Sequence, residues 1–291
     1  MEKYGKIFRI LRKDRGLTQK QAAFGVMSNK TLSEFELGKH EIKLQDFLGI
    51  INNLHISLEE FEYLLNEYEL NNFRKTLANA INFYDAQKIK PLKRLINHEF
   101  PKHKIAKLST FDYLNYLMLK SMANAIDNEE VSFSTQEKNK IINYLKSIKN
   151  WNYYELTLYA NTMRVLDDNA VVALSNAVVT NTTYYEKIPK NKYLIVDILL
   201  NTVIAFINRK QINQANHFKQ LLEKNLDAQS FYTKTILLFL EGVIDFYNGN
   251  EVIGKRKMEK GLDILENLDG DRLTDTYQNI FDVVTKKQKK S

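Results

Sequence analysis

Apolar residues recur with the spacing of an α-helix from the first turn of the chain. In residues 4–13, four apolar residues recur on one side of the expected helix: Ile7, Phe8, Ile10 and Leu11. Four basic residues are expected on the opposite side: Lys6, Arg9, Arg12 and Lys13. This pattern predicts a first helix that ends at Gly16 as its C-cap. Four more short helices are expected over residues 19–24, 29–36, 44–54 and 58–66.

Capping residues stand where these short helices are expected to begin and end. Thr18 and Ser28 precede the second and third helices, and Gly25 and Gly38 follow them. The fifth helix begins with a capping box, in which Ser57 is followed three residues later by a glutamate. The first 66 residues therefore predict a compact domain of five helices.

Beyond residue 66 the pattern predicts a series of helix pairs. The first helices of the pairs are expected over residues 68–87, 104–127, 151–166, 191–208 and 228–248. Their partners are expected over residues 91–99, 134–149, 168–186, 211–225 and 251–267, with a last helix over 271–286. The first helices begin about 40 residues apart, which is the period of helical-hairpin solenoids. We predict an all-α protein with a helix-turn-helix domain in residues 1–66 and a tetratricopeptide-like helical-repeat solenoid in residues 67–291.

Glycine placement supports the all-α prediction. Five glycines lie between residues 5 and 49, five lie between residues 242 and 270, and none lies between these groups. Many β-turns and the glycine-rich loops that bind phosphates both need glycine, so the long glycine-free stretch argues against them. We expect asparagine and aspartate to supply the left-handed turn positions there, at residues such as Asn150 and Asp167.

Charge is concentrated at the N-terminus. The whole chain carries a net charge of +7. Residues 1–45 hold ten basic and five acidic side chains, whereas residues 46–285 hold 28 basic and 30 acidic ones. A basic head on a nearly neutral body suggests that the head binds a polyanion, although a solvated basic face would give the same charge pattern.

The composition also indicates a compartment. The chain has no cysteine, which excludes disulfides, thiolate metal sites and cysteine nucleophiles. The N-terminus has no apolar core of signal-peptide length, and the longest apolar run, 193–207, is interrupted by Asp197 and Asn201. These features predict a soluble, cytoplasmic protein with no membrane partner.

Three short helices with a small turn between the second and third form the skeleton of a helix-turn-helix unit. The residues LTQ at 17–19 and the string MSNKTLSEFELGK resemble the repressor-type helix-turn-helix of phage repressors. With the following IKLQDFLGIINNLHISLEEF, the chain is similar to the Rgg/MutR family of regulators. Two later segments, IINYLKSIKNWNYYELTLYANTM and FLEGVIDFYNGNEVIGKRKMEKGLDIL, resemble the C-terminal domain of that family, so the resemblance spans nearly the whole chain.

The third helix carries the side chains that we expect to read bases. Asn29, Lys30, Thr31, Ser33 and Glu34 lie at its start or on its exposed side, and such positions reach base edges in the major groove. Gln19 begins the second helix, where donors can meet a phosphate. Exposed basic residues are expected to contact the DNA backbone. The full predicted DNA-binding set is Arg9, Arg12, Thr18, Gln19, Lys20, Ser28, Asn29, Lys30, Thr31, Ser33, Glu34, Lys39 and Lys43.

One helix-turn-helix unit makes few phosphate contacts, so useful specificity normally comes from two half-sites. We therefore expect a homodimer on double-stranded DNA. The resemblance implies the same assembly, with dimer contacts largely in the helical domain.

The helical domain predicts a second binding surface. Stacked hairpins curve and present their first helices on a concave wall, which suits an extended peptide. Two polar stripes fall on consecutive first helices: Tyr154, Thr157, Asn161 and Arg164 on one, and Asp197, Asn201 and Asn208 on the other. Asparagine can donate and accept hydrogen bonds along a peptide backbone, and Arg164 could bind its terminal carboxylate. The resemblance implies a short secreted signalling peptide that is re-imported. Solvated surface is the competing interpretation of each asparagine, because asparagine is abundant in this chain.

No motif of an enzyme is present in the sequence. The five histidines are scattered without metal-ligand spacing, and nucleophile-elbow, Walker and dinucleotide signatures are absent. We expect neither catalysis nor a cofactor nor a bound metal.

The sequence therefore predicts a peptide-responsive transcriptional regulator, in which the peptide shifts the dimer between arrangements or recruits RNA polymerase contacts. One alternative keeps DNA binding but makes the repeat domain a scaffold that only dimerises or docks proteins. Another is an adaptor that has lost DNA affinity, because Glu34 and Leu37 stand where the family commonly has arginine.

Overall fold

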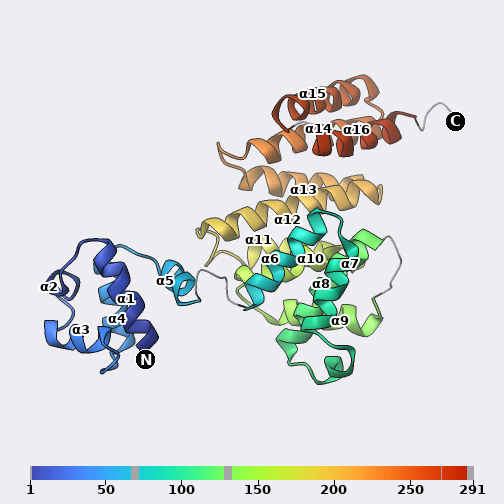
Figure 1. Cartoon of the computed structure of the whole chain (residues 1–291). Helices are drawn as coiled ribbons and strands as arrows, with labels where there is room; N and C mark the ends of the chain where they lie inside the picture. The colour runs from blue at the N-terminus through green and yellow to red at the C-terminus, as the bar shows by residue number, and fades with distance from the viewer. Residues whose placement is uncertain (1, 67–71, 128–132, 270, 287–291) are drawn as a thin grey trace. The chain divides into compact units, whose positions relative to one another are not determined.

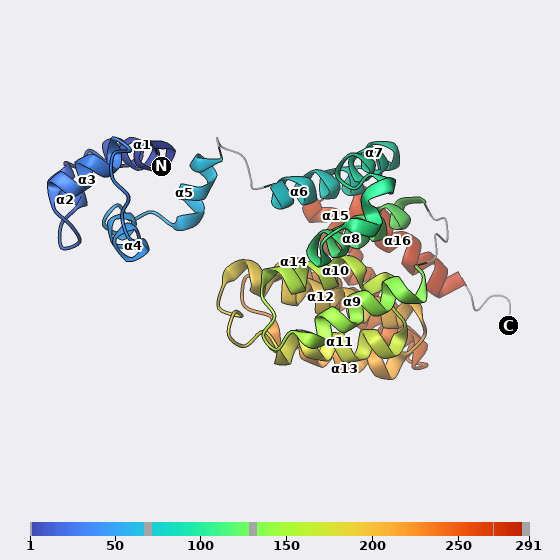
Figure 2. The same ribbon diagram turned by 90° about the horizontal axis from the view of Figure 1, so that it is seen from below.

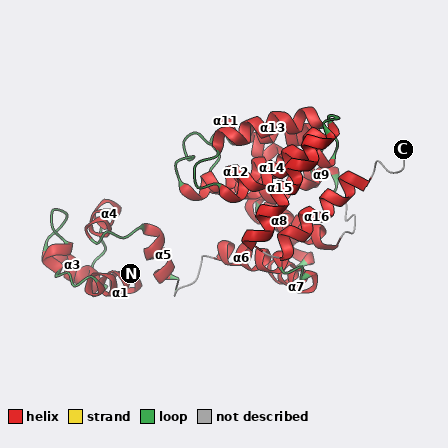
Figure 3. Ribbon diagram, turned by 90° about the horizontal axis from the view of Figure 1, so that it is seen from above, coloured by secondary structure: helices red, strands yellow, loops and turns green. Residues whose placement is uncertain are grey.

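The computed structural model describes residues 2–66, 72–127, 133–269 and 271–286. Every regular element within these ranges is a helix, and loops connect them (Figure 3). The chain divides into two compact units, Met1–Ala86 and Gln87–Ser291, which we call the N-terminal unit and the repeat unit. The predicted all-α fold class is confirmed. The predicted domain boundary at residue 67 lies outside the described residues and stays a prediction.

The N-terminal unit contains six helices within its described residues: α1 (Glu2–Asp14), α2 (Gln19–Ala22), α3 (Asn29–Glu36), α4 (Leu44–Asn53), α5 (Leu58–Leu65) and α6 (Asn72–Asp85). The apolar side chains of α1, α3, α4 and α5 meet in one core, in which Phe8, Leu32, Ile50 and Leu54 are fully buried. The helices begin at the predicted caps. Gly16, Gly25 and Gly38 adopt the left-handed conformation that ends a helix or turns the chain.

The repeat unit continues with α7 (Ile89–Glu99), the 3₁₀ helix η1 (Lys102–Lys107), α8 (Thr110–Asp127), α9 (Thr135–Ser147), α10 (Tyr153–Thr162), the 3₁₀ helix η2 (Met163–Val165), α11 (Asp168–Thr180), α12 (Pro189–Asn208), α13 (Ile212–Asn225), α14 (Phe231–Tyr247), α15 (Glu251–Asp269) and α16 (Asp271–Lys286).

The helices of the repeat unit stack as consecutive hairpins (Figure 1). The first helices of successive hairpins pack side by side, α8 on α10, α10 on α12 and α12 on α14. The second helices form the neighbouring layer, and Figure 2 shows α9, α11 and α13 following one another along one side. This arrangement is the predicted helical-repeat solenoid.

Most predicted helix bounds lie within a few residues of the observed ones, and two differences have local causes. The helix expected from residue 104 begins six residues later, because Ser109 caps α8 by accepting from the Asp112 amide at 3.1 Å. The helix expected to reach residue 186 ends at Thr180, where the Asn181 carbonyl instead accepts from the amide of Trp151 at 2.7 Å.

The prediction about left-handed turns was wrong. The non-glycine residues with positive φ among those described are His55, Gln87 and Lys210, with φ between 52° and 56°. Asparagine and aspartate instead cap helices, as when Asp167 accepts from the Ala170 amide at 2.9 Å. A side-chain cap needs a short polar side chain but no left-handed backbone. In this chain, aspartate such as Asp167 supplies the cap, and other residues adopt the left-handed conformation.

Two glycines bring α14 and α15 into backbone contact. A Cβ atom on Gly242 would lie 2.5 Å from the Gly254 carbonyl oxygen, and a Cβ on Gly254 would lie 2.5 Å from the Gly242 carbonyl oxygen. These distances leave no room for a side chain on either glycine. The glycines near the C-terminus therefore serve close helix packing as well as helix ends.

One described helix, α12, is long and apolar enough by length and composition to cross a membrane. More than half of its most apolar stretch, 56%, is buried inside the structure. Burial of this kind is typical of a core helix, and α12 lies between α10 and α14 in the stack.

Candidate functional site

Helix α3 presents its first residues to solvent and buries its last ones. Asn29 and Lys30 are exposed, Thr31, Ser33 and Glu34 are half-buried, and Leu32 packs in the core. Ser28 begins the helix, and its Oγ accepts from the Thr31 amide at 3.1 Å. The N-terminal tip of α3 is therefore both exposed and held in a defined conformation.

A buried ion pair fixes α3 against α1. Nε and Nη2 of Arg12 donate to the two carboxylate oxygens of Glu36 at 2.5 and 2.9 Å, and Nη1 donates to the Leu17 carbonyl at 2.6 Å. Arg12 is 7% exposed and Glu36 is 2% exposed. The hydrogen bond to Glu36 raises the pKa of Arg12 above its usual value, so the guanidinium stays charged.

This network corrects the prediction for Arg12. We expected Arg12 to contact the DNA backbone, but its guanidinium is committed to Glu36 and is not available at the surface. Arg12 lies four residues after Phe8 and next to Leu11, so it shares the apolar side of α1. Glu36 follows Phe35 in the same way on α3. Opposite charges on two apolar stripes were the signal that could have revealed the pair.

The predicted contacts on α2 divide into a bonded side chain and exposed ones. Gln19 is half-buried, and its Nε2 donates to Oε2 of Glu36 at 2.9 Å, which ties the start of α2 to the ion pair. Lys20 is exposed. Thr18 is also exposed, and its hydroxyl is used in a capping box with Gln21. At the other end of α2, Asn53 donates to the carbonyls of Ala22 and Phe24 at 2.9 Å each.

The remaining basic residues of the predicted DNA-binding set are exposed. Arg9 lies on α1, and Lys39 and Lys43 lie in the connection between α3 and α4. No hydrogen bond of these three side chains is recorded with another residue that the structure describes. They remain available to an anion, as do the side chains at the tip of α3.

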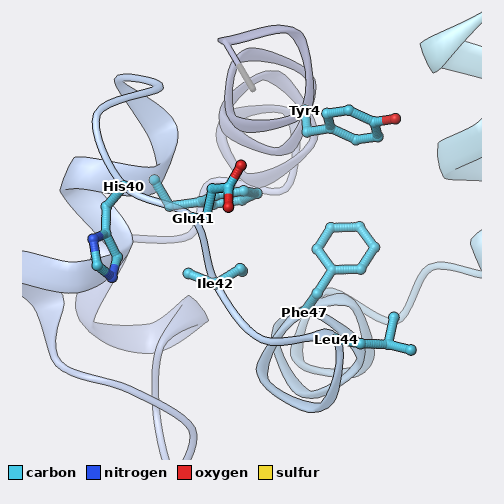
Figure 4. Close-up of a pocket in the computed structure, with 7 residues that line it drawn as sticks. Tyr4, His40, Glu41, Ile42, Leu44 and Phe47 are labelled. Atoms are coloured by element: carbon cyan, nitrogen blue, oxygen red, sulfur yellow. The ribbon is translucent and has the colours of Figure 1, made fainter.

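An apolar hollow of about 460 Å³ lies beside this connection. Figure 4 shows the rings of Tyr4 from α1 and Phe47 from α4 near each other, with Ile42 of the connection to one side of them. The Phe47 ring makes edge contacts with Phe35 at 6.3 Å and with Phe61 at 4.9 Å. The hollow contains none of the residues predicted to contact DNA.

The predicted stripe on α10 is only partly accessible. Thr157 is 4% exposed, and its hydroxyl donates to the Tyr153 carbonyl at 2.6 Å, so it cannot reach a peptide. Asn161 is half-buried and donates from Nδ2 to the Thr157 carbonyl at 2.8 Å. The prediction for Thr157 is therefore wrong. The cause is the position of α10 between α8 and α12, which covers two of its sides.

The two ends of the α10 stripe also differ. The Tyr154 hydroxyl donates to Oδ1 of Asn115 at 3.0 Å, and its ring packs on Phe111. Burial raises the pKa of Tyr154, so its hydroxyl stays protonated. Arg164 is exposed, but it lies on η2 rather than on α10, because the helix tightens after Thr162.

The stripe on α12 is accessible along its whole length. Asp197, Asn201 and Asn208 are all exposed, while the other sides of the helix bury residues such as Leu199 and Val203. Spacings of four and seven residues keep these three polar side chains on one side of the helix. The predicted surface position of this stripe agrees with the structure, and its role in binding stays a prediction.

A cavity of about 460 Å³ opens at the N-terminal end of this stripe. Residues of α12, of α14 and of the connection before α14 line it: Lys192, Tyr193, Val196, Asp197, Asp227, Gln229, Ser230, Tyr232 and Thr233. Of the predicted peptide-binding residues it includes Asp197 alone. The repeat pattern predicts α12 and α14 as neighbouring first helices, but it does not show which side chains at their N-terminal ends enclose a cavity, so the other lining residues were not predicted.

The two carboxylates of this cavity have opposite environments. Oδ2 of Asp227 accepts from Nζ of Lys192 at 2.7 Å, and Ser230 donates to Oδ1 at 2.8 Å. These hydrogen bonds lower the pKa of Asp227 to about 2. The pKa of Asp197 is instead raised, because the packed wall around it desolvates its carboxylate although the side chain meets solvent.

Comparisons of the sequence with known families agree with both units. Residues 101–279 match the C-terminal domain of the helix-turn-helix-type transcriptional regulator Rgg. Residues 8–61 match a helix-turn-helix family. The first match covers more than half of the chain and lies on the repeat unit, whereas the second covers α2 to α4 and parts of α1 and α5.

Solved structures share the fold over nearly the whole chain. The SHP pheromone receptor Rgg2 of Streptococcus dysgalactiae is 26% identical with a TM-score of 0.79, and the alignment covers 96% of this chain and 98% of the receptor. PrgX in complex with cCF10 is 14% identical with a TM-score of 0.69, covering 99% and 94%. A bacterial peptide pheromone receptor complex is 15% identical with a TM-score of 0.67, covering 98% of each chain. At 14% and 15% sequence identity, the last two structures show similarity of fold alone.

Proposed function

Because this chain belongs to the Rgg family of helix-turn-helix transcriptional regulators, we propose that it reads DNA with the tip of α3 and that a short signalling peptide sets its activity. The observation that carries the proposal is the exposed tip of α3, with Asn29 and Lys30 held outward by the cap and the buried ion pair. The Rgg2 receptor, similar over nearly its whole length, supports the peptide.

The proposed DNA contacts follow from chemistry and exposure. Asn29 can pair with adenine, Lys30 can donate to guanine, and Glu34 can accept from cytosine in the major groove. Thr31 and Ser33 lie beside them. Thr18, Gln19 and Ser28 would contact the DNA backbone at the starts of α2 and α3, and Gln19 would do so through its backbone amide, because its side chain donates to Glu36. The exposed cations Arg9, Lys20, Lys39 and Lys43 would neutralise phosphates. Arg12 is left out of this set because it holds Glu36.

The proposed peptide surface follows the first helices of the repeat unit. It comprises Tyr154, Asn161, Arg164, Asp197, Asn201 and Asn208. The amides can donate to and accept from a peptide backbone, and Arg164 can pair with a terminal carboxylate. Thr157 is left out because its hydroxyl is buried.

The proposed assembly is a homodimer acting in the cytoplasm, with residues 1–66 as the DNA-binding domain and residues 67–291 as the peptide-sensing and dimerisation domain. Two copies can engage two half-sites, which one copy cannot do. The peptide acts by linkage, because it shifts the dimer between arrangements by no more than its differential affinity, or it favours contact with RNA polymerase.

A DNA titration tests the proposal. The full chain is titrated with the DNA upstream of its own gene and with a scrambled duplex, at several salt concentrations, by fluorescence anisotropy. We expect tighter binding to the upstream DNA, and a salt slope that reports the number of phosphates neutralised. Equal affinity for both duplexes would overturn DNA reading and favour the adaptor.

A peptide screen tests the second half of the proposal. A pool of synthetic eight-residue peptides is presented to the immobilised full chain, and retained peptides are then added to the DNA complex. We expect a retained peptide to change both the melting temperature and the DNA affinity. If no peptide is retained, the repeat unit is a scaffold for dimerisation or protein docking.

A further inference from the structure

The cavity between α12 and α14 contains a carboxylate that the described residues leave unpaired. No hydrogen bond or ion pair of the Asp197 carboxylate is recorded within the part of the chain that the structure describes, and desolvation is the cause that raises its pKa. A carboxylate held in this way favours a ligand that supplies positive charge.

The cations near this cavity are engaged elsewhere. Nζ of Lys192 donates to Asp227, and Nζ of Lys234 donates to the Asp227 carbonyl at 2.5 Å. Nζ of Lys190 lies over the ring of Tyr153, 5.2 Å from its centroid. The basic side chains at this end of α12 and α14 therefore do not neutralise Asp197.

Two tyrosines line the same cavity and reach solvent. Tyr193 is 66% exposed and lies one helical turn before Asp197 on α12. Tyr232 is 51% exposed and comes from α14. Exposed aromatic rings beside a carboxylate form a favourable site for an ammonium or guanidinium group, because the ring faces and the carboxylate both attract positive charge.

We propose that this cavity binds a positively charged group of the signalling peptide, with Asp197 as its counter-ion and Tyr193 and Tyr232 as its aromatic walls. The proposal rests on the proposed peptide sensing and adds the chemistry of the ligand. The group is a lysine or arginine side chain or the N-terminal ammonium of the peptide. Asn201 and Asn208 continue from the cavity along α12 and follow the peptide backbone.

The opposite charges of Asp197 and Arg164 also set a polarity. A peptide with a cation at the cavity and its terminal carboxylate near Arg164 would satisfy both groups at once. An anionic peptide would leave Asp197 unpaired and add repulsion. The cavity therefore discriminates between peptides by charge as well as by shape.

The test selects peptides on the full chain and then removes charges one at a time. Eight-residue synthetic peptides with every position randomised are selected on the wild-type chain and on Asp197→Asn, which keeps the shape and removes the charge. Asp263→Asn is the matched control, because it makes the same charge change at an exposed position of α15, outside the residues that line the cavity. We expect lysine or arginine to be enriched on the wild type and on the control, but not on Asp197→Asn.

A cycle of substitutions then locates the interaction. The best peptide is compared with a version in which norleucine replaces its lysine and with an N-acetylated version, by fluorescence anisotropy. We expect Asp197→Asn to lower the affinity for the cationic peptide about tenfold. The same substitution should not change the affinity for the peptide version that has lost the bound cation. The version that shows no change therefore identifies the cation as a lysine side chain or as the N-terminal ammonium. Tyr193→Ser, at an exposed residue, should weaken the cationic peptide about threefold.

The outcomes separate this inference from the function on which it rests. Retention of no peptide by the wild type overturns peptide sensing and this inference with it. Retention of peptides without a preferred cation, or equal affinity for wild type and Asp197→Asn, overturns this inference alone. An equal loss on Asp263→Asn would also overturn it, because the effect would then be one of net charge.

Discussion

The N-terminal unit and the repeat unit satisfy their buried polar groups in different ways. In the N-terminal unit, Arg12, Glu36 and Gln19 form a charged network that joins α1, α2 and α3. In the repeat unit, the hydroxyls of Tyr159 and Ser175 are hydrogen-bonded at 2.6 Å, and the hydroxyls of Ser175 and Thr202 are hydrogen-bonded at 2.9 Å. Hydroxyl side chains predominate among the buried polar residues described in the repeat unit, where Glu155 is the buried charged one, and the ion pairs that join its helices, such as Lys219 with Glu241, are less deeply buried than Arg12 with Glu36.

Size accounts for this difference. A small unit buries a smaller share of its surface, so fewer apolar contacts define the angles between its helices. A bidentate ion pair has a defined geometry and can set the angle between α1 and α3. The repeat unit has a larger apolar core, and each of its inner helices packs on two neighbours. The small unit should therefore be more sensitive to the loss of one side chain.

The largest expected effect is on the ion pair. Arg12→Ala would leave the buried Glu36 without a counter-ion, with Gln19 as its remaining side-chain partner, which we expect to destabilise the N-terminal unit by about 3 kcal/mol. The chain has a single tryptophan, Trp151, which is fully buried in the repeat unit. Its fluorescence should therefore report an unchanged denaturation midpoint, while circular dichroism reports early loss of helix.

Arg9→Ala is the matched control for this substitution. Arg9 lies on the same helix and is exposed, so its loss should change stability by less than about 0.5 kcal/mol. If Arg12→Ala and Arg9→Ala unfold alike, the ion pair does not hold the unit together.

The next effect concerns DNA rather than stability. Asn29→Ala and Lys30→Ala should each weaken binding to the specific site by about 1–3 kcal/mol and relax its sequence preference. Lys39→Ala is expected to weaken binding to specific and non-specific DNA about equally, and to reduce the slope of log affinity against log salt concentration by about 1. Anisotropy titrations on both duplexes measure these differences. If Asn29→Ala lowered the affinity for the upstream and the scrambled duplex by the same factor, Asn29 would not be a base-reading residue.

A smaller effect is expected in the core of the repeat unit. Tyr159→Phe removes a hydroxyl that contacts Ser175, but Ser175 keeps its contact with Thr202. We expect a loss of about 1.5 kcal/mol, measured as the denaturation midpoint of Trp151 fluorescence. Tyr184→Phe, at a residue that is 79% exposed, should have no measurable effect. A loss as large as that of Arg12→Ala would contradict the proposed difference between the units.

The smallest effects compare one cap in each unit. Ser28 caps α3 and Ser134 caps α9 through the same hydrogen bond to a backbone amide, at 3.1 and 3.2 Å. Substitution of either by alanine should cost about 1 kcal/mol. Only Ser28→Ala should also weaken DNA binding, and circular dichroism with anisotropy would reveal a departure from this pattern.

Local sequence signals predicted much of the fold. Caps such as Ser28 and Ser57 and the left-handed glycines mark helix ends through bonds within a few residues, so their positions can be read along the chain. The spacing of the expected helices predicted a short helical domain followed by helix pairs, and the family resemblance implied the same order. The exposed tip of α3 also followed from its amphipathic pattern.

The side-chain contacts between neighbouring helices were beyond this reasoning. Thr157 has the spacing of a surface stripe, yet neighbours on two sides bury Leu156, Thr157 and Leu158 in succession. The repeat period predicts that α14 packs beside α12, but the cavity at Asp197 depends on which side chains of the connection before α14 reach α12, and the sequence does not show this. Arg12 was misassigned because a basic residue near the N-terminus fits a phosphate contact as well as it fits a buried pair.

The backbone contact between Gly242 and Gly254 has a mechanical consequence. Helices that touch without intervening side chains have no soft layer between them, so sliding one along the other would drive carbonyl oxygens into the opposite main chain. The hairpin of α14 and α15 should therefore move as one rigid body. Strain that enters it from α12 would be transmitted along its length instead of being absorbed.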